Sequence, residues 1–125
     1  MKINIETIPH SEQKYPTVGD YWVDADGTWH IRVSEMGNWK YEFLVAFHEL
    51  CEKALCTERG ITDEEITAFD IEFEKNRPEG NVDEPGNHKD APYRLEHNIA
   101  TFIESGMAQA LGVDWNKYDA AINKL

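Results

Sequence analysis

One short stretch of the chain, residues 48–52 (HELCE), places one histidine and two glutamates inside an otherwise apolar helical segment. The apolar run 43–47 precedes it, and Ala54, Leu55 and Cys56 follow it. A helix that is apolar around most of its circumference is expected to be largely buried, and an unpaired buried carboxylate is costly. The fold must therefore supply partners for these groups, and a bound cation would satisfy all of them together.

The spacing within this stretch sharpens the prediction. His48 and Glu52 are four residues apart, so they lie on one face of the helix, one turn above the other. Glu49 follows His48 and lies about 100° further round the helix axis. The sequence thus predicts two metal ligands, His48 and Glu52, with a free carboxylate beside them.

Composition limits the kinds of protein this chain can be. The 125 residues suffice for one domain with one core, over residues 1–125, and 41% hydrophobic residues argue against disorder. No apolar run approaches the roughly 20 residues that cross a bilayer, and the start of the chain lacks the pattern of a signal peptide. We expect a cytoplasmic protein without a membrane partner. Cys51 and Cys56 lie on different faces of one helix, so we expect both to stay reduced.

The chain is strongly acidic, with a net charge of −12 from 24 acidic and 12 basic residues. Nucleic acid is disfavoured as a partner because no basic stripe is present to displace counterions. The charge fits a soluble surface, a cationic partner, or mimicry of nucleic acid towards a DNA-binding protein.

The residue patterns predict an α+β fold. The first part, residues 1–37, is read as β: residues 2–8 alternate, and the runs 21–23 and 29–33 flank an Asp-Gly turn. We expect an N-terminal antiparallel β-hairpin or small sheet, followed by three main helices and a short C-terminal helix.

Helix boundaries within residues 38–125 follow from capping signals. Asn38 and Gly60 bracket the first helix, expected over about 39–57. A capping box at 62–65 opens the second helix, which ends before Pro78. The third helix is expected from about residue 90 to 111, and Asp114 caps the last one. The loop 78–92 is long for a compact domain, so it is mobile or covers a site.

The motif resembles that of the zincins, a class of zinc-dependent hydrolases. In zincins two zinc ligands lie four residues apart on a helix, and the residue after the first is a Glu that acts as general base. Here the second helix ligand is Glu52 where zincins have His, but a Glu oxygen binds zinc at about the same distance. The resemblance spans about residues 21–104. It implies hydrolysis of a peptide or amide bond with Glu49 as the base, beside an edge strand that aligns an extended peptide.

The third predicted helix offers the missing histidine. If it packs antiparallel to the first helix, His97 approaches His48 and Glu52. Two His and one carboxylate would then leave one coordination position open for water. Glu96 or Glu104 would orient a histidine through its free ring nitrogen.

A second resemblance, over residues 43–118, is to small uncharacterised proteins of tailed bacteriophages. It implies the host cytoplasm as location, and it is carried by the segments 48–50 (HEL), 59–61 (RGI), 69–70 (FD), 84–86 (EPG), 91–93 (APY), 96–97 (EH) and 112–115 (GVDW).

Two other functions fit the same sequence. The metal can have a structural role, in which it links the first and third predicted helices. A fourth ligand such as His88, Asp70 or Glu96 would then complete its coordination. Alternatively, the chain is an acidic interaction protein without a metal, for example a phage inhibitor that occupies a basic cleft on a host protein.

Each site residue also has an ordinary structural interpretation. His48 can be a hydrogen-bonded core histidine, Glu49 can pair with Lys53, and His97 can lie at the surface. Glu84, like the other acids of the loop 78–92, is read as a turn former.

Overall fold

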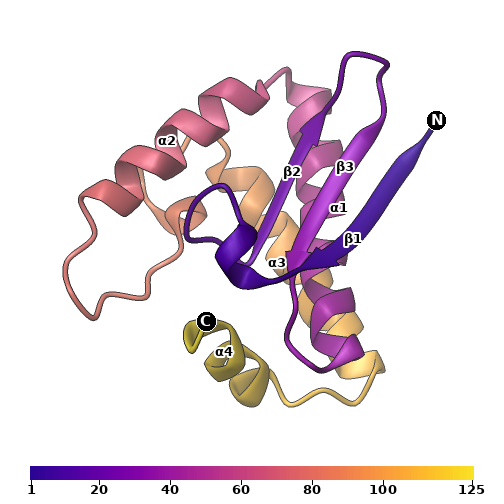
Figure 1. The fold of residues 1–125 in the computed structure, drawn as a ribbon, viewed down its shortest axis with the longest axis vertical. Helices are drawn as coiled ribbons and strands as arrows, with labels where there is room; N and C mark the ends of the chain where they lie inside the picture. The colour runs from indigo at the N-terminus through magenta and orange to yellow at the C-terminus, as the bar shows by residue number, and fades with distance from the viewer.

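The computed structural model describes all residues, 1–125, and confirms the predicted α+β fold (Figure 1). A three-stranded sheet at the N-terminus is followed by four α-helices. The elements are β1 (Ile3–Ile8), the 3-10 turn η1 (His10–Glu12), β2 (Gly19–Val23), β3 (Trp29–Ser34), α1 (Trp39–Arg59), α2 (Asp63–Lys75), the 3-10 turn η2 (Pro85–Asn87), α3 (Arg94–Ala110) and α4 (Trp115–Asn123).

The sheet has the order β1-β3-β2. Strands β2 and β3 form the predicted antiparallel hairpin, with Tyr21 opposite Ile31. Strand β1 pairs parallel with β3 and places Ile5 beside Ile31, an arrangement that the alternating pattern of β1 left open. Strand β2 is consequently an edge strand of the sheet.

Helix α1 packs against β2 and β3 and carries much of the core (Figure 1). Its Leu44 and Cys56 are fully buried together with Ile31 and Val33 of β3. The capping signals hold: the Asn38 side chain accepts hydrogen bonds from the first turn of α1, and Gly60 ends α1 in the left-handed conformation. The core thus fixes α1, which carries the residues 48–52, beneath the edge strand.

Helices α1 and α3 pack antiparallel. His48 contacts Glu104 while Glu52, further along α1, contacts His97, which is earlier on α3. At the far end the Lys40 ammonium donates a hydrogen bond to the carbonyl of Leu111. This antiparallel register is the one that the predicted site requires.

The connection between α2 and α3 packs against both of these helices. Its turn η2 brings Glu84 and Gly86 against the ring of His97. The loop 78–92 was expected to be mobile or to cover a site. In the structure it covers the ring of His97. None of the helices has the length and apolar character needed to cross a membrane.

Candidate metal centre

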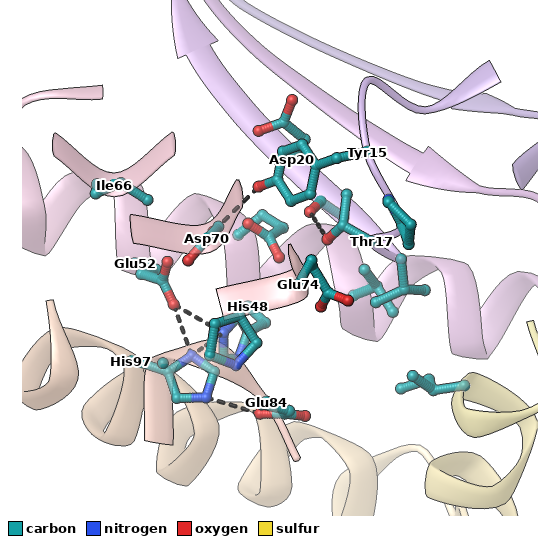
Figure 2. Close-up of a pocket in the computed structure, with 18 of the residues that line it drawn as sticks. Tyr15, Thr17, Asp20, His48, Glu52, Ile66, Asp70, Glu74, Glu84 and His97 are labelled. Atoms are coloured by element: carbon teal, nitrogen blue, oxygen red, sulfur yellow. Dashed lines mark hydrogen bonds and ion pairs between the residues drawn. The ribbon is translucent and has the colours of Figure 1, made fainter. Parts of the chain in front are cut away.

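Three buried side chains bring one ligand atom each to a common point (Figure 2). His48 Nε2 lies 3.1 Å from Glu52 Oε2 and 3.2 Å from His97 Nδ1, and the Glu52 oxygen lies 2.9 Å from His97 Nδ1. Three tetrahedral ligands bound at about 2.1 Å from an ion stand about 3.4 Å apart. The cluster is therefore within a few tenths of an ångström of metal-site geometry and can hold a metal ion.

The outer nitrogen of each histidine faces a carboxylate. His48 Nδ1 lies 2.8 Å from Glu104 Oε1, and His97 Nε2 lies 2.7 Å from Glu84 Oε2. Such carboxylates fix the tautomer and ring orientation of metal-binding histidines. Each histidine that donates its N–H outward turns a lone pair inward.

Tyrosines hold the carboxylates in turn. The Tyr118 hydroxyl donates to Glu104 Oε2 at 2.6 Å, and the Tyr21 hydroxyl donates to Glu52 Oε1 at 2.8 Å. These bonds leave Glu52 Oε2 free to face the two histidines. Ligands and supporting groups come from α1, α3, β2, α4 and the loop before α3, so most of the fold contributes to positioning them.

Hydrogen-bond accounting at the centre of the cluster favours a cation. With both histidines donating outward, two imidazole lone pairs and one carboxylate oxygen converge with no donor among them. Buried acceptors without a partner are costly. A divalent ion satisfies all three atoms at once, as does protonation of the rings.

Without a bound ion, the electrostatics of the cluster correspond to protonated rings. Burial acts to lower the pKa of His48, but its hydrogen bonds to Glu104 and Glu52 outweigh burial and raise that pKa well above its usual value. Burial acts to lower the pKa of His97, but the hydrogen bonds to Glu52 and Glu84 outweigh it and raise that pKa to about 9. For Glu52 burial acts in the opposite direction, yet the bonds from both histidines bring its pKa down to about 2. Glu52 is therefore ionised in the native protein and available as a ligand.

Glu49 is the one acid of the motif that makes no hydrogen bond to the protein. Its carboxylate lies over the backbone of Gly19, where an added Cβ would come within 2.7 Å of Oε1. The ordinary alternative for Glu49 does not apply, because Lys53 pairs with Asp63 instead, at 3.1 Å. Burial, followed by the proximity of Glu52, raises the pKa of Glu49 well above its usual range. Such a carboxyl group is suited to accepting and releasing protons.

A cavity of about 340 Å³ opens beside the cluster and is lined by Glu49, His48, Glu52 and His97. Its other walls are rich in carboxylates, and Arg77 is its only Arg or Lys side chain. The Arg77 guanidinium is bound to Glu74 at 2.7 Å. The space next to the ligands is therefore lined by both apolar groups and carboxylates, and it is large enough for part of a substrate.

Asp70 forms a second polar group in the wall of this cavity. Its carboxylate accepts hydrogen bonds from the hydroxyls of Tyr15, at 3.1 Å, and Tyr93. Tyr93 also packs edge-on against the ring of His97. Burial outweighs these hydrogen bonds and raises the pKa of Asp70 to about 6.

Several residues that the sequence offered lie outside the cluster. Glu96 pairs with Arg59 at 2.9 Å, so of the two acids proposed to orient a histidine only Glu104 does so. His88 packs against Phe69 and Phe73. The candidates for a fourth, closing ligand are thus engaged elsewhere.

Two parts of the site were missed at the sequence level. The loop pattern predicts Glu84 to be a turn former, whereas the structure places its carboxylate 2.7 Å from His97 Nε2, thirteen positions further along the chain. Gly86 packs on the His97 ring so closely that a Cβ there would overlap it. A Glu-Pro-Gly run inside a long loop was the only available signal, since neither residue belongs to a periodic element.

Comparisons with family models, with characterised proteins and with solved structures found no significant match to this chain.

The outer carboxylates yield a test of metal binding. We expect Glu104→Gln to weaken zinc affinity about 10–100-fold, because the amide no longer favours the tautomer that turns the His48 lone pair inward. Glu96→Gln is the matched control, because Glu96 is buried on the same helix but contacts neither histidine. Competition titration with a chromophoric chelator measures both affinities. Equal losses in the two variants would contradict the assigned role of Glu104.

Asp70 yields a test by pH. Its pKa is raised from 3.8 to about 6 in the native state, so the folded protein binds this proton more tightly than the unfolded chain. This contribution to stability is fully present below pH 3.8 and is lost as the pH rises through about 6, a change of about 3 kcal/mol. We expect urea denaturation at several pH values to show this loss in the wild type but not in Asp70→Asn. The free energy of unfolding of the variant should therefore rise relative to that of the wild type by the same amount as the pH increases. A constant difference would show that the Asp70 carboxyl is not held in this state.

Proposed function

We propose that the chain is a metal-dependent hydrolase of peptide or amide bonds, with zinc as the metal. His48, Glu52 and His97 are the proposed ligands, and Glu49 is the proposed general base. The observation that carries the proposal is the unpaired Glu49 carboxylate, which lines the same cavity as the three convergent ligand atoms. Two His and one Glu also match a common donor set of catalytic zinc.

Each residue has a defined task in this mechanism. Glu104 and Glu84 hold the histidines in the ligand tautomer, and Tyr21 holds the Glu52 carboxylate. A zinc ion supplies Lewis acidity, lowering the pKa of a water molecule and polarising a carbonyl group. Glu49 accepts the proton of the attacking water and returns it to the departing amine, which its raised pKa favours.

The ligand count favours catalysis over a structural staple. Structural zinc sites are closed by four protein ligands, whereas catalytic sites keep one position open. The cluster here has three ligands beside a cavity, and Asp70 and Glu96 are bound to other partners. The acidic charge also fits a binding protein without a metal, but nine of the 24 acidic residues line that cavity.

The cavity walls favour a compact substrate with a positive charge. The register of the hairpin turns the N–H groups of Tyr21 and Val23 towards the free edge of β2. Those groups already donate to the carboxylates of Asp20 and Asp63. The edge strand is therefore occupied along the stretch where an extended peptide would pair. Carboxylates on the walls attract an ammonium or guanidinium group instead.

Substitution of the proposed base separates chemistry from metal binding. We expect Glu49→Gln to lower turnover about 10²–10⁴-fold, because the amide cannot accept the proton, while the bound zinc stays at one ion per chain. Hydrolysis of fluorogenic peptide amides and metal analysis of the same preparations measure the two quantities. Glu58→Gln, at an exposed position of the same helix, should change neither.

His97→Ala completes this experiment, since it should remove both the zinc and the activity. Full turnover in Glu49→Gln would contradict the assigned base. Wild-type protein that binds no zinc would contradict the metal centre itself.

The substrate preference is tested with peptide amides of equal length. We expect a kcat/KM at least about tenfold higher for substrates carrying Lys or Arg beside the scissile bond than for those carrying Glu, with the difference shrinking in high salt. Hydrolysis that favours the acidic substrates would refute the role of the cavity carboxylates.

A further inference from the structure

The outer face of α3 differs in character from the rest of the surface. Its exposed residues are Arg94, Leu95, Asn98, Ile99, Phe102, Ile103, Ser105, Gly106, Gln109 and Ala110. None of them is acidic, although the chain contains 24 acidic residues. The acids of α3, Glu96 and Glu104, are buried on the inner side with His97.

Large apolar side chains form a stripe along this face. Leu95 is 55% exposed, Ile99 and Ile103 are each 38% exposed, and Phe102 is 79% exposed. Residues spaced three and four apart are neighbours on a helix surface, so these side chains form one continuous stripe. An exposed apolar stripe of this kind is typical of a surface that contacts another protein.

Gly106 lies on the same face and has no role inside the chain. A Cβ built on it would meet nothing within 4 Å. Glycine in the middle of a helix is less stable than alanine, so its presence here has a cost that no internal contact offsets. A position without a side chain on an open helix face permits close approach by a group from outside.

The size of the side chains along the face identifies the partner. The first half of the stripe is bulky, up to Ile103, whereas three of the four exposed residues after it are small, namely Ser105, Gly106 and Ala110, with Gln109 as the larger one. Two copies of α3 packed antiparallel about a two-fold axis near residue 104 place Ile103 of each copy beside Ser105, and Ile99 beside Gln109, of the other copy. Phe102 of one copy then faces Gly106 of the other.

Charge favours the same partner. The molecule has a net charge of −12, so most of its surface repels a second copy and attracts cationic proteins. The α3 face is the exception, because two such faces can meet without bringing carboxylates together. A cationic partner would find no acidic group to bind there.

We propose that the protein forms a symmetric homodimer through the outer face of α3. The 17-residue helix is about 25 Å long. Such an interface falls at the small end of specific interfaces, and its dissociation constant should lie in the micromolar range. The proposal does not depend on the metal centre, which lies on the opposite side of α3.

Sedimentation velocity of the full chain, between about 1 and 300 µM, tests the dimer. We expect the wild type to pass from monomer to dimer over this range. Phe102→Glu should weaken association at least 100-fold, because it replaces the largest apolar contact with a charge that would be buried against Gly106 of the other copy. Ile71→Glu is the control, because Ile71 is half-exposed on α2, away from this face, and should leave association unchanged.

A second variant, Gly106→Leu, distinguishes a loss of dimerisation from a loss of folding. Leucine is a better helix former than glycine, so the melting temperature of the dilute monomer should rise or stay the same. Dimerisation should nevertheless weaken at least tenfold, because the new side chain meets Phe102. A wild type that stays monomeric at the highest concentration would overturn the proposal. So would a dimer that Gly106→Leu leaves intact, or one that Ile71→Glu disrupts as strongly as Phe102→Glu.

Discussion

The contact between α1 and α3 at His48, Glu52 and His97 is the constraint on which the rest of the structure depends. Three polar atoms meet within 3.2 Å of one another inside a small protein. The three residues are each at most 8% exposed, so the surrounding protein must supply most of their polar contacts. Carboxylates accept hydrogen bonds from the outer ring nitrogens of both histidines. Tyrosine hydroxyls in turn donate hydrogen bonds to Glu104 and Glu52. Sheet, loop and last helix each contribute one of these groups.

Ionisable side chains occupy buried positions here that are apolar in most protein cores. Replacing buried charges by apolar residues is often neutral or stabilising, so stability alone does not account for them. A preorganised ligand set does, because the histidines are already oriented and need little rearrangement when an ion enters. The glycines at 19 and 86 fit the same interpretation, since each makes room for a site side chain.

Local signals in the sequence predicted the hairpin, the capping residues of α1, α2 and α4, and the helical spacing of His48 and Glu52. The start of α3 was not predicted, because it begins at Arg94 without a side-chain cap and not near residue 90. The local signals also indicated His97, because only an antiparallel register of two helices was needed to bring it near. Glu84 could not be found in this way, because its position depends on how a non-periodic loop crosses the helices. The parallel pairing of β1 and the tyrosine support of Tyr118 are likewise set by tertiary packing, which periodicity does not encode. Helix α1 was expected to be largely buried, yet its Phe43 is 42% exposed, because the small sheet covers only one side of it.

The most direct test of the central claim is X-ray absorption spectroscopy of the full chain loaded with one equivalent of zinc. The structure predicts a first shell of nitrogen and oxygen at about 2.0–2.2 Å, with the outer-shell scattering of two imidazoles and no sulfur. A sulfur neighbour at about 2.3 Å would place the ion at the cysteines. A shell without imidazole scattering would place it among the surface carboxylates. Either result would contradict a metal centre built from positions 48, 52 and 97.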